Sequence, residues 1–201
     1  LLYVMKGISF YTLQLRAKGY EEKEPDHFVM KGLFSTITNA NFDKAVFVER
    51  IKAGLALRSR LQAKLQASGG AGAAKIPECA TWFSNSTAEF EVQAALIGIL
   101  STRDEDIRSL RGLIIYGLKG MAAYAEHAFN LGHEDPDIYA FMHRAMAATV
   151  NDELTADDLI KMVMETGSYG VKAMALLDKA NTGRYGNPEI TRVNIGVRKN
   201  P

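Results

Sequence analysis

The sequence predicts an all-α fold: two duplicated three-helix bundles joined by a linker, with a C-terminal strand that leads toward an absent α/β domain. Three observations support this prediction. Apolar residues recur at helical spacing through most of the 201 residues. Capping residues, glycines and prolines divide these stretches into lengths typical of helices. A shift of 113 positions superimposes many residues of the first half on identical residues of the second.

The first bundle is predicted to contain three helices. Apolar residues repeat at helical spacing over residues 1–18, and Gly19 follows as a helix-terminating residue. Pro25 suits the first turn of a second helix, which is expected to end near Thr38. Asn41 is expected to cap a third helix over residues 42–67. The inner face of this third helix is expected to carry Phe47, Ile51, Leu55, Leu61 and Leu65.

The second bundle begins with two capping-box patterns. Ser86 and Glu89 predict a short helix near 87–97, and Thr102 and Glu105 predict a long helix from about 103 to Leu131, closed by Gly132. Two further helices follow, each predicted from its start residues. Asp135 and Pro136 open one that ends near Thr149, and Thr155 and Asp158 open the last, which ends near Ala180.

The repeat at an offset of 113 indicates a duplicated domain, because a solenoid would use shorter and more numerous units. The long helix of the second unit begins about ten residues before Ile114, the equivalent of Leu1, so the first helix is expected to have lost roughly that much of its start. The superimposed pairs are Tyr3 and Tyr116, Lys6 and Lys119, Gly7 and Gly120, Tyr11 and Tyr124, Gly19 and Gly132, Phe28 and Phe141, Thr36 and Thr149, and Gly54 and Gly167.

Composition shifts mark the boundaries between these parts. The Gly- and Ala-rich run from Ser68 to Ala74 is typical of a linker, and turn residues continue to Ser86. After Ala180, turn residues precede the alternation of Val193 to Val197, which predicts a strand of a sheet encoded elsewhere. The predicted parts are a truncated first bundle at 1–67, the linker at 68–86, the second bundle at 87–180, and the turn and strand at 181–201.

Composition excludes several classes of function. Lys and Arg total 24 against 23 Asp and Glu, so the net charge of +1 favours neither nucleic acid nor an anionic membrane as a partner. No apolar run approaches the roughly 20 residues that a membrane-spanning helix needs. Cys79 is the only cysteine, which rules out an intrachain disulfide or a cysteine-ligated cluster within this chain and indicates a cytoplasmic protein.

The histidines raise the question of a metal site. Glu24 and His27 have the spacing that di-iron bundles use, but such a site needs two of these motifs and two further glutamates, so an exposed first-turn histidine is favoured. His127, His133 and His143 are expected on polar faces or in loops rather than as metal ligands. A di-iron bundle remains a distant alternative.

Other chemistry-bearing residues also favour structural roles. Cys79 has no nearby histidine or basic cluster that would activate it as a nucleophile. Gly183 and Gly186 precede no helix, which disfavours nucleotide binding, and no Ser/His/Asp set has a local pattern. We therefore predict no catalytic, cofactor-binding or metal-binding residue. Trp82, Phe83 and Phe90 are expected to anchor the linker, with a ligand channel as the alternative, and Gly7 and Gly120 to permit close helix approach.

Five stretches of the sequence carry a resemblance to a known family. The five stretches are LIIYGLKGMAAYAEHA (residues 113–128), DIYAFMH (137–143), GVKAMALLDKANTG (170–183), YGNPEIT (185–191) and FSTITNANF (34–42). In these stretches the chain resembles the N-terminal helical region of the hybrid-cluster protein family, also called prismane protein or hydroxylamine reductase. The resemblance covers nearly the whole chain and is weakest in the linker.

The resemblance implies a helical domain of two three-helix bundles, followed in the parent by two α/β domains. Family members carry an N-terminal iron-sulfur cluster and a hybrid iron-sulfur-oxo cluster, and none of the family's ligands falls on a residue of this chain. The parent is then expected to reduce hydroxylamine to ammonia, to act on nitric oxide and to need an electron donor. This chain alone is expected to bind no cluster and to be inactive. The alternative is a free-standing helical protein-interaction module.

Overall fold

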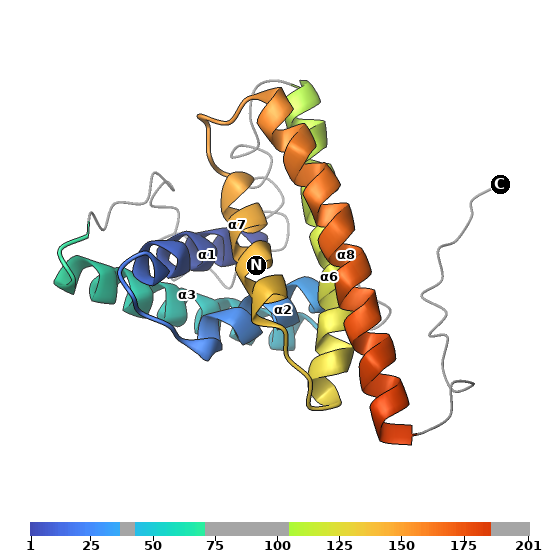
Figure 1. Cartoon of the computed structure of the whole chain (residues 1–201). Helices are drawn as coiled ribbons and strands as arrows, with labels where there is room; N and C mark the ends of the chain where they lie inside the picture. The colour runs from blue at the N-terminus through green and yellow to red at the C-terminus, as the bar shows by residue number, and fades with distance from the viewer. Residues whose placement is uncertain (37–42, 71–104, 186–201) are drawn as a thin grey trace.

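A computed structural model describes residues 1–36, 43–70 and 105–185, and this part of the chain is all-α, as the sequence predicts (Figure 1). None of its helices is long and apolar enough to cross a membrane. The predicted linker beyond Gly70, the short helix near 87–97 and the strand at 193–197 lie outside the described residues. The helices are α1 (Leu2–Arg16), α2 (Lys23–Ser35), α3 (Lys44–Ala67), α6 (Glu105–Asn130), α7 (Pro136–Ala148) and α8 (Ala156–Tyr185).

The predicted helix-terminating glycines are confirmed. Gly19 and Gly132 follow α1 and α6 with φ of 84° and 85°, the left-handed region that glycine adopts without a steric penalty. The next amide in each case donates back into the helix: Tyr20 N–H to the Leu15 carbonyl and His133 N–H to the Ala128 carbonyl, each at 3.0 Å. This pattern satisfies carbonyls that would otherwise lack a partner at the helix end.

Two of the predicted N-terminal caps are also confirmed. The Asp135 carboxylate accepts from the backbone N–H groups of Asp137 and Ile138 at the start of α7. Thr155 and Asp158 form a reciprocal capping box at α8: the Asp158 carboxylate accepts from the Thr155 N–H, and the Thr155 hydroxyl accepts from the Asp158 N–H.

Three predicted boundaries differ from the structure. The third helix begins at Lys44, where Asp43 is the capping residue; the expected cap, Asn41, lies outside the described residues. The second helix begins at Lys23 and ends at Ser35, so Pro25 lies in its first turn, where a missing N–H is tolerated. The last helix continues past Ala180 to Tyr185, and within it the Thr182 hydroxyl donates to the carbonyls of Asp178 and Lys179.

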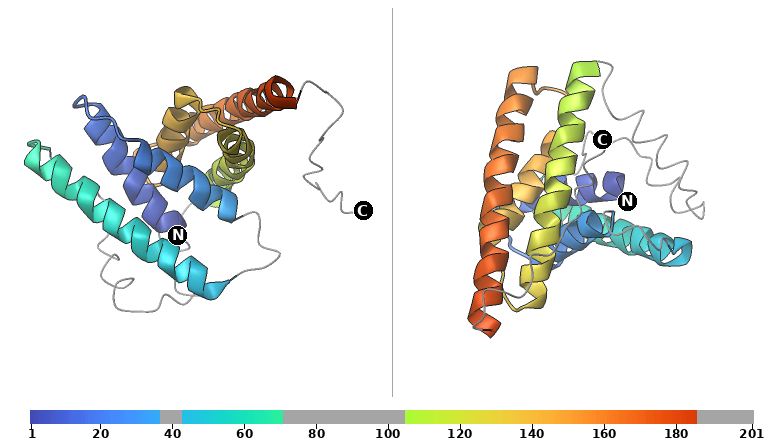
Figure 2. Two further views of the ribbon diagram at one scale, coloured as in Figure 1. Left: turned by 90° about the horizontal axis from the view of Figure 1, so that it is seen from below. Right: turned by 90° about the vertical axis from the view of Figure 1, so that its right-hand side faces the viewer.

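The helices of the two halves pack into one continuous core. α1 lies against α3 and α7, α2 lies against α6, and α6 and α8 run side by side along most of their length (Figures 1 and 2). All six described helices contribute buried apolar residues to this core. A shared core does not divide the described residues into parts, and the predicted boundaries between the two bundles stay predictions. Its largest fully buried side chains include Tyr3, Tyr11, Phe141, Met5, Ile8, Met30, Leu33, Ile51, Leu61, Leu65 and Ile114.

Equivalent positions of the predicted duplication do not all pack alike. The bounds of α2 and α7 differ by 113 residues at both ends. Close approach is confirmed at Gly7, where a Cβ would lie 2.6 Å from Nε of Arg58; at Gly120 a Cβ would meet nothing within 4 Å among the described residues, so close approach there stays a prediction. In α6 it is Gly117 that packs closely, against the Thr166 side chain. The duplication itself stays a prediction.

Candidate functional site

A buried polar network joins three helices around His143. This residue of α7 is fully buried, with its Nδ1 atom 2.9 Å from Oγ of Ser9 on α1 and its Nε2 atom 2.8 Å from Oδ1 of Asp26 on α2. Arg16, at the end of α1, donates from Nη2 to the same carboxylate oxygen. We call these four residues the His143 network.

The protonation of the His143 network follows from its geometry. Burial lowers the pKa of His143 below its usual value, although the Asp26 carboxylate acts in the opposite direction, so the ring is neutral at pH 7. A carboxylate only accepts hydrogen bonds, so the Nε2–H group donates to Asp26. Nδ1 is then an acceptor, and the Ser9 hydroxyl donates to it. Every hydrogen-bonding atom of the ring therefore has a partner.

Ser9, His143 and Asp26 are the residue types of a catalytic triad, but their setting is that of a core. Ser9 and His143 are both fully buried, so no substrate reaches the hydroxyl. The network therefore cross-links α1, α2 and α7 rather than activating a nucleophile. The prediction that His143 lies on a polar face is wrong. Almost all of α7 is apolar, a pattern typical of a helix buried all round, and this was the signal that its histidine is buried.

The His143 network predicts a loss of stability in mild acid. An unfolded histidine titrates near pH 6.5, whereas burial lowers the pKa of His143 in the folded chain. Below about pH 6.5 the unfolded state therefore binds the extra proton and the folded state does not, so the free energy of unfolding falls as pH falls. Urea unfolding between pH 5 and 8 measures this. The free energy of unfolding of a His143→Gln variant should depend less on pH than that of a His133→Gln control. The same pH dependence in both variants would contradict the assignment.

The remaining predicted metal candidates do not converge in the described part of the chain. Glu24 pairs with Arg60 at 2.7 Å, whereas His27 packs against the Phe129 ring at a centroid distance of 4.6 Å. The prediction that His27 is exposed is wrong, because Phe129 and Tyr139 cover much of it.

The other histidines also lack a metal-binding geometry. His127 meets the Phe34 ring edge-on at 5.5 Å, and His133 lies in the turn before α7. Among the described residues, no group of three His, Cys, Asp or Glu side chains could hold a metal ion. Cys79 and the aromatic residues Trp82, Phe83 and Phe90 lie outside these residues. The expectation of no catalytic, cofactor or metal ligand stays a prediction.

Buried positive charge is a second feature that the sequence did not reveal. Lys6, Arg58 and Arg111 are each more than nine-tenths buried. Burial and the nearby Arg111 guanidinium lower the pKa of Lys6 to about 8. Arg58 lies over the Tyr3 ring, and its Nε and Nη1 atoms have no hydrogen-bond partner among the described residues. Arg111 donates to the Asn151 carbonyl at 2.8 Å and lies 3.6 Å from the Asp152 carboxylate, which offsets part of the cost of burying its charge.

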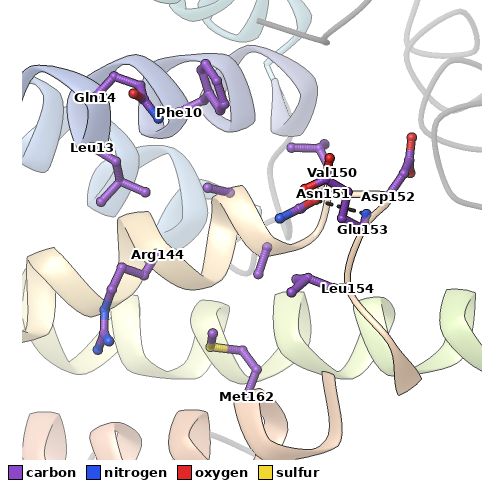
Figure 3. A pocket seen from close by; sticks show the side chains of 12 residues that line it. Phe10, Leu13, Gln14, Arg144, Val150, Asn151, Asp152, Glu153, Leu154 and Met162 are labelled. Carbon is purple, nitrogen blue, oxygen red and sulfur yellow. Dashed lines mark hydrogen bonds between the residues drawn. The ribbon is translucent and has the colours of Figure 1, made fainter. Parts of the chain in front are cut away.

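A half-open cavity of about 580 Å³ lies between α1, α7 and the start of α8 (Figure 3). Its volume suits a small organic ligand. Arg144, on its edge, is already paired with Glu165 at 3.0 Å, and no metal-binding group accompanies the cavity in the described chain. The lining residues are Phe10, Leu13, Gln14, Arg144, Ala147, Ala148, Val150, Asn151, Asp152, Glu153, Leu154 and Met162.

The described residues form an all-α domain with a buried polar network at its centre. Comparison with known proteins shows which family this domain belongs to. The sequence model of the Prismane/CO dehydrogenase family matches residues 1–201. The chain therefore belongs to the Prismane/CO dehydrogenase family.

Three relatives, each named hydroxylamine reductase, illustrate the similarity. The chain is 60% identical to the protein of Desulfitobacterium hafniense strain DCB-2, 55% identical to that of Parabacteroides distasonis and 51% identical to that of Clostridium tetani. The whole of this chain is aligned in each case, but it covers only 37%, 36% and 39% of the respective relatives. The chain thus spans little more than a third of the length of these proteins.

Proposed function

We propose that this chain is the helical scaffold domain of an iron-sulfur oxidoreductase similar to hydroxylamine reductase. The observation that carries the proposal is the family match over residues 1–201, together with relatives up to 60% identical that bear that name. The parent would reduce hydroxylamine to ammonia and water with two electrons and two protons, would act on nitric oxide, and would work in the cytoplasm with a separate electron donor.

The residues of this chain would provide shape rather than chemistry. Iron clusters supply the electrons in reactions of this kind. The described residues do not fit such a group, because no three potential ligands lie together and both ring nitrogens of His143 already have partners. The His143 network would fix the relative positions of α1, α2 and α7. The clusters would be held by the parent's other domains, and this chain alone would be inactive.

Iron and acid-labile sulfide analysis tests this division of roles. The isolated chain, prepared without oxygen, should contain neither iron nor sulfide in stoichiometric amounts and should not reduce hydroxylamine with a chemical electron donor. The complete polypeptide, prepared in the same way, is the positive control and should contain both. Stoichiometric iron in the isolated chain would contradict the proposal, and its loss in a Cys79→Ser variant would show that the thiolate holds it.

A free-standing helical interaction module is the second candidate. It is favoured by the large apolar side chains that α6 and α8 expose, Tyr116 and Met164 among them. The two candidates differ in the gene: a module predicts a reading frame that starts near Leu1 and stops near Pro201, whereas a scaffold domain predicts coding sequence for cluster ligands on either side.

A further inference from the structure

One face of α8 exposes a stripe of large apolar side chains. Ile160, Met164, Val171 and Met174 are 45%, 72%, 62% and 41% exposed. They are separated by four, seven and three residues, so they lie on one side of the helix. We call these four residues the α8 stripe. Gly167 lies on the same side in the middle of the stripe.

The α8 stripe is distinct from the face with which α8 joins the core. That other face carries Leu159, Thr166, Ala173 and Leu177, all of which are buried. At about 100° per residue, the two faces are centred roughly a third of a turn apart. A helix with apolar residues over so wide an arc is typical of one that is packed on two sides. In the described chain only one side of α8 is packed.

The equivalent positions of α3, 113 residues earlier, are covered by other helices. Residues 113 positions earlier than Met164, Gly167 and Met174 are Ile51, Gly54 and Leu61, all buried in the core. The opposite side of α3 is polar, since Arg60 and Lys64 both pair with Glu22. Apart from the exposed Val46, α3 is therefore apolar on one side, whereas α8 is apolar on two.

Gly167 leaves open space in the middle of the α8 stripe. A glycine within a helix costs about 1 kcal/mol relative to alanine, a cost that a close contact can offset. At Gly54 that contact exists, because a Cβ there would lie 2.6 Å from the Phe28 ring and 2.7 Å from a Val4 methyl. At Gly167 a Cβ would meet nothing within 4 Å. The opening above Gly167 is therefore available to an incoming side chain.

We propose that the α8 stripe is an interdomain docking surface that receives an apolar face of the rest of the hydroxylamine reductase-like polypeptide. The occupant is indicated by length: the chain covers only 37% of the relative from Desulfitobacterium hafniense, so about 63% of that protein is available to cover it. The methionines of the stripe suit such a surface because their flexible side chains adapt to a partner. This inference rests on the proposed function.

Oxidative footprinting read by mass spectrometry tests the docking surface directly. Met164 should be oxidised rapidly in the isolated chain and at least fivefold more slowly in the complete polypeptide. Met30, which is fully buried, should be protected in both, and Val46, which is exposed on α3, should react in both. Equal oxidation of Met164 in the two samples would overturn the proposal, as would equal protection of Val46 and Met164 in the complete polypeptide.

Two further readouts separate the competing explanations. Protection of Met164 in the isolated chain that increases with its concentration would assign the stripe to a second copy and overturn the proposal. Iron analysis of the complete polypeptide separates this inference from the proposed function: iron present with Met164 unprotected rejects only the docking surface, whereas absent iron rejects the proposed function.

A charge on the stripe provides a second test. Met164→Lys should leave the helicity and the unfolding midpoint of the isolated chain unchanged, because the side chain is exposed there. In the complete polypeptide the same change should raise the oxidation rate of Met174 severalfold, since the partner no longer covers it. Lys161→Glu, a charge change beside the stripe, is the control. It should leave the helicity and the unfolding midpoint of the isolated chain unchanged, and it should not raise the oxidation rate of Met174 in the complete polypeptide. An unchanged Met174 rate in the Met164→Lys polypeptide would count against the surface.

Discussion

Asp26→Ala is expected to lower the free energy of unfolding by about 1 to 3 kcal/mol, the range for leaving a buried donor without its acceptor. The substitution leaves the Nε2–H group of His143 without its acceptor at 2.8 Å and the Arg16 guanidinium without its counter-ion. His143 is fully buried, so water cannot replace the lost acceptor, whereas the Arg16 side chain is partly exposed and regains some hydration. Urea unfolding followed by circular dichroism at pH 7 measures the change.

Two control variants separate the network from ordinary charge effects. Asp26→Asn keeps an oxygen that can accept from His143 and removes only the charge that faces Arg16, so it should cost less than Asp26→Ala. Asp137→Ala removes an exposed carboxylate that pairs with Lys172 at 2.9 Å, and should cost much less than Asp26→Ala because solvent screens this pair. Equal losses of unfolding free energy for Asp26→Ala and Asp137→Ala would show that the His143 network stabilises the fold no more than an exposed ion pair does.

The helical elements could be predicted from the sequence because their determinants are local. Gly19 and Gly132 end their helices where predicted, and Asp135 and Thr155 begin theirs. Each of these features depends on residues within about one turn of the chain. The boundary at Ala180 was wrong because turn residues are only a statistical indication of a helix end, and α8 continues through them to Tyr185.

The polar centre could not be predicted because its determinants are distant in sequence. His143 lies 134 residues from Ser9 and 117 from Asp26, and no local spacing connects them. Only the tertiary packing of α1, α2 and α7 brings the three side chains together. The same holds for Gly117: the sequence indicated Gly120 for close approach in α6, but in the tertiary structure it is at Gly117 that a Cβ would meet the Thr166 side chain of α8.

Function could be predicted from the sequence only through the family resemblance. The residues taken alone specified no reaction, and the described structure brings together no metal-binding group. The family is established by similarity over residues 1–201. Under the proposed scaffold role, the chemistry of the parent would depend on ligands located in its other domains.

Gly54→Ala and Gly167→Ala are expected to change stability in opposite directions, although the two glycines are 113 positions apart in the predicted duplication. Both are inside helices, so alanine brings each the same intrinsic gain of up to about 1 kcal/mol. At Gly54 the new methyl group would meet Phe28 and Val4 within 2.7 Å, and such overpacking costs about 1 to 3 kcal/mol. Gly54→Ala should therefore be destabilising, whereas Gly167→Ala should be stabilising in the isolated chain.

Comparing the isolated chain with the complete polypeptide makes the glycine pair a test of packing rather than of helix propensity. Thermal unfolding midpoints of both variants measure the effect. If the α8 stripe is covered in the complete polypeptide, Gly167→Ala should lose its stabilising effect there, because the methyl group would fill the opening that the partner uses. Gly54→Ala should be destabilising in both contexts, since Phe28 and Val4 belong to this chain. A stabilising Gly54→Ala would show that the helices separate at little cost.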